Sequence, residues 1–173
     1  MKIIGFTYID GRAELVLRAD SCLLNGKKPF FIPDGSQDVR ANRAVILRVS
    51  RLGKNIQQKF ANRYYDAWAP GLDIIAWDKL EQARANGRSW TEAIAFDYSL
   101  PLGDWLSEEE LGIWSEQLCI SPAKAIEQAS RLMTIRQGDL IYIDYAQHGV
   151  QIQREDIIEG PAGLEDKLYC KIK

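Results

Sequence analysis

The chain has 173 residues, of which 46% are hydrophobic and 27% charged, with a formal net charge of −2 at pH 7. These values are typical of a globular domain and argue against intrinsic disorder. Lysine and arginine are spread along the chain, so the sequence gives no basic footprint for nucleic acid. The length fits a single domain over residues 1–173, long enough to bury roughly two-thirds of its unfolded surface.

The sequence predicts neither membrane insertion nor export. The apolar N-terminal run is too short for a signal-peptide core, and no run approaches the roughly 20 apolar residues of a membrane span. The three cysteines, Cys22, Cys119 and Cys170, stand far apart without a C-x-x-C motif. We therefore expect reduced, buried thiols in a cytoplasmic protein.

The N-terminal region predicts strands. Residues 1–9 and 13–19 are strand-like runs on either side of the turn Asp10-Gly11. Residues 38–49 follow as a second strand region. In its second half Val45, Leu47 and Val49 alternate with Ile46 and Arg48, which is the period of a strand. The first half of that strand contains Arg40 and Arg43 but little acid.

After Gly53 the apolar period changes to four, at Ile56, Phe60 and Tyr64. This stripe predicts a helix from about Asn55 to Trp68, which Pro70-Gly71 ends. A short strand over 71–78 and a short helix over 79–87 then follow.

The second half of the chain mixes short strands with one clear helix. Residues 90–105 are strand-like, and Ser107 with Glu110 forms a capping box that predicts a short helix. Ser121 and Pro122 begin a helix that runs to about Met133, whereas residues 113–120 fit either a strand or a helix tail. Alternation predicts three C-terminal strands, over 139–145, 149–153 and 167–173. The pattern predicts an α+β domain with more strand than helix.

Local motifs carry little chemistry. The chain has one histidine, His148, so a two-histidine metal site and an H-E-x-x-H motif are excluded. A catalytic triad would need His148 in a predicted hairpin turn, where a solvated residue is favoured over a catalytic base. No nucleophile elbow or glycine-rich phosphate loop is present.

Four blocks of sequence together resemble the fumarylacetoacetate hydrolase family: DSCLLNGKKPFFIPD (20–34), RVSRLGKNIQQKFANRYYDAWAPGLDIIAWD (48–78), AFDYSLPLGDW (95–105) and SRLMTIRQGDLIYID (130–144). They stand in the family's order, and the second block is the most specific. The resemblance covers the chain from about Asp20 to its end. It implies an α+β, β-rich fold, namely a mixed β-sheet roll with a few short helices, and a homodimer.

The resemblance also implies a chemistry, the cleavage or rearrangement of β-dicarbonyl acids on Mg²⁺ or a similar ion. The ion is held by a Glu-x-Glu pair on one strand and an Asp on the next, because a hard cation prefers several anionic oxygens. The two Glu positions fall on Asn42 and Ala44, while Asp73 matches the third ligand. One carboxylate would hold a divalent ion too weakly, so we expect no bound metal and no cofactor.

Other family positions are also changed. The arginine after the metal-binding Asp becomes Trp77, the substrate-binding lysine becomes Ile94, and a Gly-Thr-Pro turn becomes residues 144–146 with Tyr145 at its centre. The N-terminal loop with the family's His-Glu pair is missing. The resemblance therefore implies a non-catalytic homologue that binds a small organic acid or a protein partner. Its remnant pocket would comprise Asn42, Ala44, Asp73, Trp77, Ile94 and Tyr145.

Alternatives remain open at this stage. A divergent hydrolase, decarboxylase or isomerase of β-dicarbonyl acids could use Asp73, Asp78 and Asp144 with a different metal or none. A third hypothesis is a subunit that completes a site in an active homologue. Asp73 is as readily a structural residue that bonds backbone N–H groups near Gly71, and Trp77 is expected to fill the vacated pocket. Asp97 and Asp139 are expected to fix loops.

Overall fold

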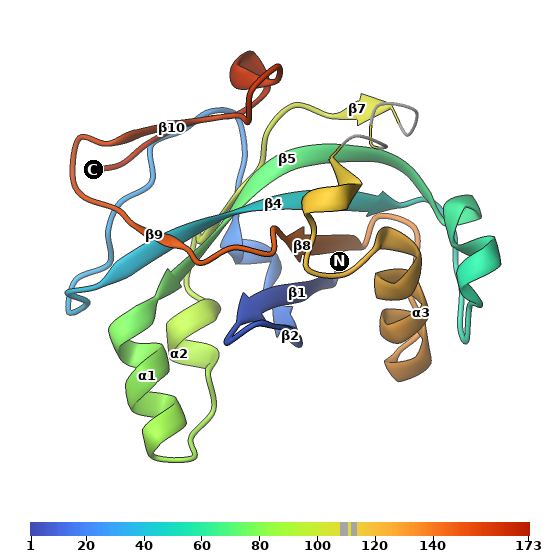
Figure 1. Ribbon diagram of the computed structural model, residues 1–173, viewed down its shortest axis with the longest axis horizontal. Helices are drawn as coiled ribbons and strands as arrows, with labels where there is room; N and C mark the ends of the chain where they lie inside the picture. The colour runs from blue at the N-terminus through green and yellow to red at the C-terminus, as the bar shows by residue number, and fades with distance from the viewer. Residues whose placement is uncertain (108–110, 112–113) are drawn as a thin grey trace.

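A curved sheet built around two long strands dominates the structure (Figure 1). The computed structural model describes residues 1–107, 111 and 114–173. The strands are β1 (Ile3–Ile9), β2 (Arg12–Arg18), β3 (Leu23–Leu24), β4 (Val39–Val49), β5 (Tyr65–Ala76), β6 (Leu100–Pro101), β7 (Leu106–Ser107), β8 (Leu140–Asp144), β9 (Val150–Gln151), β10 (Ile157–Glu159) and β11 (Tyr169–Lys171). The α-helices are α1 (Trp77–Ala85), α2 (Thr91–Ile94) and α3 (Pro122–Leu132). Short 3₁₀ helices are η1 (Asp20–Cys22), η2 (Gln58–Arg63), η4 (Ser115–Gln117) and η5 (Glu165–Lys167). The predicted α+β, β-rich fold is confirmed.

The main sheet is mixed and has the order β2-β1-β8-β4-β5-β7, with β9 pairing to β4 beside β8. The strands β4 and β5 are antiparallel over their full lengths, from Val39 opposite Ala76 to Val49 opposite Tyr65. The strand β1 pairs parallel to β8, which brings residues 3–6 next to residues 140–143 in one sheet. Two small sheets, β3-β6 and β10-β11, flank the main one.

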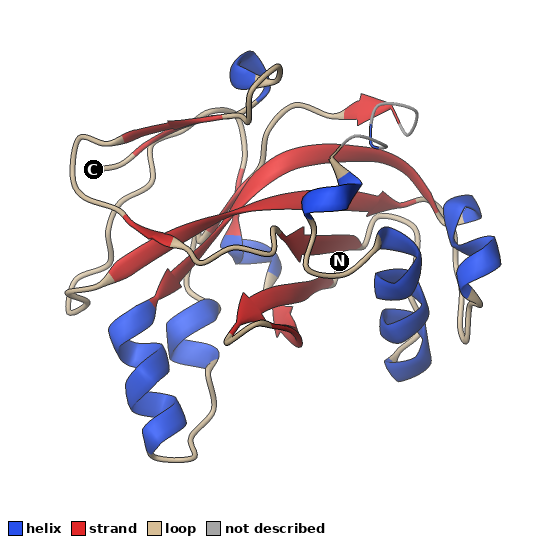
Figure 2. Cartoon of the chain, in the orientation of Figure 1, coloured by secondary structure: helices blue, strands red, loops and turns tan. Residues whose placement is uncertain are grey.

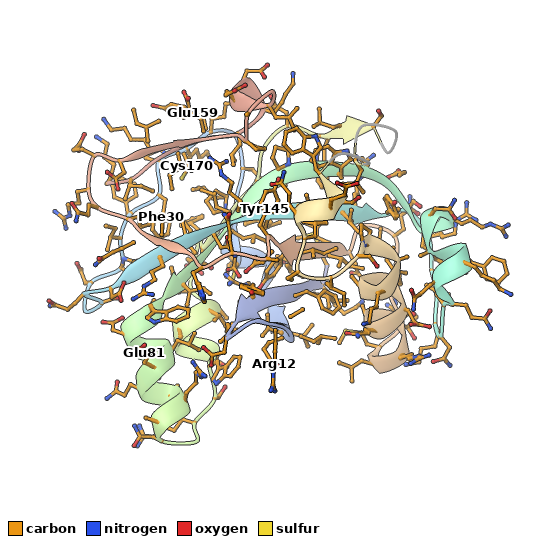
Figure 3. The ribbon with its side chains drawn as sticks, viewed as in Figure 1. Arg12, Phe30, Glu81, Tyr145, Glu159 and Cys170 are labelled. Atoms are coloured by element: carbon orange, nitrogen blue, oxygen red, sulfur yellow. The ribbon has the colours of Figure 1, made fainter. Side chains whose placement is uncertain are left out.

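Each face of the sheet buries its own apolar cluster, because successive side chains on a strand point to opposite faces. The helix α3 covers one face, whose cluster includes Ile4, Phe6, Val45, Leu47, Ile141 and Ile143. The helices α1 and α2 cover the other face at the opposite end of the molecule (Figure 2). The cluster there includes Ile3, Ala44, Ile46, Leu140 and Tyr142. A third cluster, with Phe30 and Cys170, lies near β10 (Figure 3).

Several predicted elements are confirmed. Asp10 and Gly11 both have positive φ, as a two-residue hairpin turn with strand-matched twist requires. The helix α3 begins after Ser121, whose hydroxyl accepts a hydrogen bond from the Lys124 backbone N–H at 3.3 Å. Asp139 fixes a loop, because its carboxylate accepts from the backbone N–H groups of Lys2 and Arg136 at 2.8 Å each.

The helix predicted from Asn55 to Trp68 is wrong. Only the 3₁₀ helix η2 forms there, and Tyr65 already belongs to β5. The backbone N–H groups of Asn55 and Ile56 bond to Ser130 of α3, at 3.0 and 2.9 Å, so tertiary contacts fix this segment. Phe60, assigned to the buried stripe, is 38% exposed.

Pro70 and Gly71 do not end a helix but lie inside β5. Proline is tolerated there because the far side of β5 is bordered at this point by a loop rather than a full strand. The Pro70 carbonyl accepts from the Gly103 backbone N–H at 2.8 Å.

The segment 90–105, expected to be a strand, instead contains α2 and the short β6. Ser107 lies in β7, and Glu110 of the expected capping box is outside the described residues. The three cysteines are free thiols, with Cys22 and Cys170 buried and Cys119 half-buried. None of the helices in the described ranges is long and apolar enough to cross a membrane.

Candidate functional site

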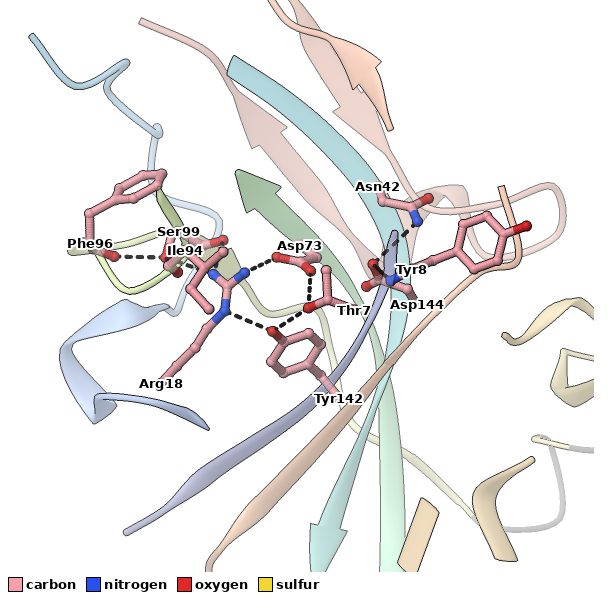
Figure 4. A network of polar contacts seen from close by, with 10 residues as sticks. All are labelled: Thr7, Tyr8, Arg18, Asn42, Asp73, Ile94, Phe96, Ser99, Tyr142 and Asp144. Atoms are coloured by element: carbon pink, nitrogen blue, oxygen red, sulfur yellow. Dashed lines mark hydrogen bonds and ion pairs between the residues drawn. The ribbon is translucent and has the colours of Figure 1, made fainter. Parts of the chain in front are cut away.

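Seven polar side chains are buried together on the sheet face that α1 and α2 cover (Figure 4). We call them the Arg18 cluster: Thr7, Arg18, Asn42, Asp73, Ser99, Tyr142 and Asp144. They come from five strands and from the segment before β6. The register explains their convergence, because Asn42 lies directly opposite Asp73, and Ala44 lies opposite Asp144.

An ion pair between Arg18 and Asp73 forms the centre of the cluster. Both side chains are 0% exposed. The Arg18 Nη2 donates to Asp73 Oδ1, while Thr7 Oγ1 donates to Asp73 Oδ2 at 2.9 Å. Burial lowers the pKa of the guanidinium, but the Asp73 carboxylate and Tyr142 outweigh burial and raise that pKa. Arg18 therefore stays charged inside the protein.

Neutral groups accept the remaining hydrogen bonds of the Arg18 guanidinium. Arg18 Nε donates to the Tyr142 hydroxyl at 2.8 Å, and Nη1 donates to Ser99 Oγ at 2.9 Å. The Tyr142 ring lies across Gly5 on the neighbouring strand, where any Cβ atom would overlap the ring. Glycine at this position is therefore what allows the tyrosine hydroxyl to reach Arg18.

Asp144 and Asn42 form the other end of the cluster. Asp144 Oδ2 accepts from the Tyr8 backbone N–H at 2.9 Å and from Asn42 Nδ2 at 3.3 Å. The Oδ1 atoms of Asn42 and Asp144 have no partner among the described residues. Burial first, and then the negative charge of Asp73, raise the pKa of Asp144 well above its ordinary value of 3.8. A protonated Asp144 leaves Arg18 and Asp73 as a balanced pair of charges.

Asp144 gives the fold a specific pH dependence. Because its folded pKa lies above 3.8, the folded chain holds a proton that the unfolded chain releases above about pH 4. The free energy of unfolding should therefore fall as the pH rises from about 4 through the folded pKa. Denaturant unfolding at about pH 5 and pH 8 should show Asp144→Asn gaining stability relative to the parent at the higher pH.

Asp139 provides the matched control of opposite sign. Although burial raises its pKa, hydrogen bonds and the charge of Lys2 lower it overall. Its stabilisation is present above the ordinary pKa of an aspartate and is lost on acidification, so Asp139→Asn should lose stability at neutral pH. Parallel curves for the parent and Asp144→Asn across this pH range would contradict a buried proton on Asp144.

No family model matches the chain, but individual proteins do. The mitochondrial oxaloacetate decarboxylase of Dictyostelium discoideum is 24% identical over 139 residues, which cover 70% of this chain and 64% of that protein. The mitochondrial oxaloacetate tautomerase fahd-1 of Caenorhabditis elegans is 22% identical, covering 97% and 91% of the two chains. A solved structure from Yersinia pestis CO92, assigned to the fumarylacetoacetate hydrolase family, superposes with a TM-score of 0.85. It is 19% identical and covers 99% of this chain and 91% of its own.

The chain is similar to members of the fumarylacetoacetate hydrolase family in sequence, and it shares their fold. Its fold is the fold of the Yersinia pestis protein over almost the whole length. It spans less than two-thirds of the Dictyostelium relative, whose activity is therefore not transferred with the fold. The positions that the sequence resemblance assigns to the metal ligands, Asn42, Ala44 and Asp73, lie on the face that the Arg18 cluster occupies.

Three of the six sequence-predicted site residues come together there. Asn42 and Asp73 belong to the Arg18 cluster, and the methyl group of Ala44 is buried opposite Asp144. One alternative expected the Asp73 carboxylate to bond backbone N–H groups near Gly71. Among the described residues it instead accepts hydrogen bonds from the Thr7 hydroxyl and the Arg18 guanidinium.

The other three lie around this group. Trp77 is half-buried; its indole donates to Glu81 at 2.9 Å, and the Arg40 guanidinium lies 4.6 Å from its ring centroid. The side chain that contacts Asp73 is Arg18 rather than Trp77. Ile94 is buried among apolar residues, and its carbonyl accepts from Ser99 at 3.3 Å (Figure 4). The carbonyl of Tyr145 accepts from Asn42 at 3.1 Å, whereas its side chain packs in the cluster facing α3.

The alternative enzyme hypothesis also used Asp78 and Asp144, and these two carboxylates lie in different places in the structure. Asp144 lies beside Asp73, but Asp78 accepts from Ser36 Oγ at 2.6 Å and from the Gln37 backbone N–H at 2.8 Å. Asp78 therefore fixes a loop at the start of α1. His148 is exposed, as expected of a turn residue, with its ring 5.9 Å from the Tyr8 ring.

Sequence reasoning missed four members of the cluster: Thr7, Arg18, Ser99 and Tyr142. The sequence contains a weak signal for Arg18. It stands two residues after Val16 in β2, so both side chains point to the same buried face, whereas Leu17 between them is 51% exposed. An arginine in phase with a buried valine indicates a buried charge, but its partner lies 55 residues away along the chain.

The residues at the metal positions do not fit a divalent ion. They offer one carboxylate, one amide and one methyl group, and the carboxylate is already bonded to a guanidinium and a hydroxyl. Over residues 1–107, 111 and 114–173, no group of three or more His, Cys, Asp or Glu side chains could hold a metal. A second cation beside Arg18 would also be repelled in this low-dielectric interior.

Proposed function

We propose that the chain is a non-catalytic member of the fumarylacetoacetate hydrolase family. One observation carries the proposal: the guanidinium of Arg18 is bonded to Asp73, and both side chains are 0% exposed. A substrate would have to displace a buried ion pair to reach the carboxylate, at a desolvation cost of several kcal/mol. The geometry supports a structural role for this cluster better than a role in binding or turning over a substrate.

Turnover assays test the proposal directly. The purified chain should not accelerate oxaloacetate tautomerisation, oxaloacetate decarboxylation or acylpyruvate hydrolysis above a blank that contains only Mg²⁺ or Mn²⁺. The reason is that the metal positions supply neither a Lewis acid nor a free base. A catalytically active family member assayed in parallel provides the positive control. Saturable turnover that disappears in Asp73→Asn would overturn the proposal.

The second candidate is a divergent hydrolase, decarboxylase or isomerase of β-dicarbonyl acids. Two observations favour it: the relatives are named for reactions of oxaloacetate, and Asp73 lies beside Asp144, whose pKa is raised by burial and by the charge of Asp73. Such a pair can supply one base and one acid. This enzyme would lose activity in Asp144→Asn, although that substitution retains the shape of the side chain.

Partners are part of the same proposal. We expect a symmetric homodimer, which light scattering coupled to size exclusion tests. A mass near 19.6 kDa at tens of micromolar would contradict it. The aromatic segment NRYYDAWAPG (62–71) is a candidate for the contact, but only residues 62–66 are accessible, because residues 67–71 are buried. A small organic acid would find no open cleft at Arg18, so retained small molecules and co-purifying homologues should be identified together after native purification.

A cytoplasmic location also belongs to the proposal. The two named relatives are mitochondrial, so the location of this chain does not follow from theirs. Cell fractionation with an antibody to the untagged protein tests it, and recovery in an organelle fraction would reject the proposed location.

A further inference from the structure

We infer that the guanidinium of Arg18 stands in for the metal ion of the family, as a cation tethered to the chain that also excludes divalent ions. This inference deepens the proposed function and rests on it in one respect, namely that Asp73 serves the fold rather than a reaction. It assigns to Arg18 two roles, compensation of Asp73 and blockade of the metal position.

The position of the guanidinium carries the first step. Arg18 reaches Asp73 from β2, across the intervening strands, at the point where Asn42 lies opposite Asp73. The family's two Glu positions, Asn42 and Ala44, are on this same face. The tethered cation thus contacts the one retained carboxylate at the place where a metal would contact it.

The completeness of its contacts carries the second step. All three guanidinium nitrogens of Arg18 donate, to Tyr142, Ser99 and Asp73. Both oxygens of Asp73 accept, from Arg18 and Thr7. A divalent ion would have to break these bonds to use Asp73.

The surroundings make the exclusion strong. Apolar side chains that include Ile75, Leu80, Ile94 and Leu100 belong to the apolar cluster on this face. In such an environment two cations repel far more than in water, because little solvent screens them. Arg18 and a divalent ion are therefore alternatives at this position, and this chain contains the arginine.

The test restores the missing carboxylates with and without Arg18. The double variant Asn42→Glu/Ala44→Glu and the triple variant that adds Arg18→Ala are titrated calorimetrically with Mn²⁺ and with Mg²⁺. The triple variant should bind one ion at least 100-fold more tightly than the double variant, and its melting temperature should rise with metal. The parent should show neither effect. Arg40→Ala in the double background is the matched control, since Arg40 is a partly exposed arginine bonded to Asp38.

Chemical rescue provides an independent readout that needs no engineered ligands. Arg18→Ala should melt at a lower temperature than the parent and be restored in part by millimolar guanidinium, but not by Mg²⁺ or by Na⁺. If the triple variant does not fold, the rescue of the single variant Arg18→Ala tests the inference instead. Arg18→Lys in the double background is a further test, because the shorter lysine should exclude the metal ion less completely and allow tighter binding than in the double variant.

Two results would overturn the inference: equal metal affinity of the folded double and triple variants, or rescue of Arg18→Ala by Mg²⁺ as effective as rescue by guanidinium. Turnover by the parent would reject the proposed function instead. It would leave the competition between Arg18 and metal measurable in the same variants.

Discussion

Arg18→Met should lower the free energy of unfolding by about 3–5 kcal/mol, the usual cost of breaking a buried pair from one side. The side chain of methionine occupies much of the same volume, so the main loss is the charge. Asp73 would remain 0% exposed without its counter-charge. Denaturant unfolding followed by circular dichroism measures the effect.

Two controls separate the buried charge from general damage. Arg40→Met breaks a partly exposed pair with Asp38 and should cost no more than about 1 kcal/mol. Arg18→Met combined with Asp73→Leu should recover much of the lost stability, because the pair is replaced by apolar groups of similar size. A loss below about 1 kcal/mol for Arg18→Met alone would show that Asp73 is not the charged, buried partner described above.

Gly5→Ala should destabilise the fold by about 3 kcal/mol, from overpacking together with a lost charge-assisted hydrogen bond. The added methyl group would overlap the Tyr142 ring, which must then move away from Arg18 and Thr7. Its hydroxyl bonds those residues at 2.8 and 2.9 Å and would be pulled out of reach. Thermal unfolding of the purified variant measures the loss.

Gly149→Ala is the matched control. Its new Cβ atom would lie 3.4 Å from the nearest atoms, which is an ordinary contact, so the expected change is within about 0.5 kcal/mol. Gly5→Ala should also be non-additive with Tyr142→Leu, because the smaller side chain removes the collision that the alanine creates. Strictly additive losses would mean that Gly5 and Tyr142 do not act together.

The strands were predictable where the local pattern and the tertiary environment agree. The hairpin at Asp10-Gly11 needs positive φ at both turn residues, which Asp and Gly adopt readily. The helix α3 combines a serine cap, a proline in its first turn and an apolar stripe. Such signals are local, so no knowledge of the rest of the chain was needed.

The helix predicted over Asn55–Trp68 does not form, because the residues of its apolar stripe, Ile56, Phe60 and Tyr64, are not buried together on one side of a helix. Asn55 has a positive φ of 53°, which interrupts any helix, and its backbone N–H bonds to Ser130. These constraints come from α3, about 75 residues later in the chain. Propensity and period could not reveal them.

The candidate site was half predictable for the same reason. The family resemblance implied that Asn42 and Asp73 lie on neighbouring strands, and the two residues are directly paired in the sheet. The replacement cation did not follow, because Arg18 comes from β2, outside the blocks that carry the resemblance. A charge in a strand shows its partner only when the sheet order is known.

The parallel pairing of β1 with β8 also has a consequence for synthesis of the chain. Ile3 to Phe6 pair with Leu140 to Ile143, so the first strand to leave the ribosome is next to one of the last. Contacts of such long sequence separation form slowly, because loop-closure entropy is lost before they stabilise anything. A nascent chain that ends before β8 holds Arg18 and Asp73 without Tyr142, and the hairpin β1-β2 must wait, with its inner edge unpaired, until β8 emerges.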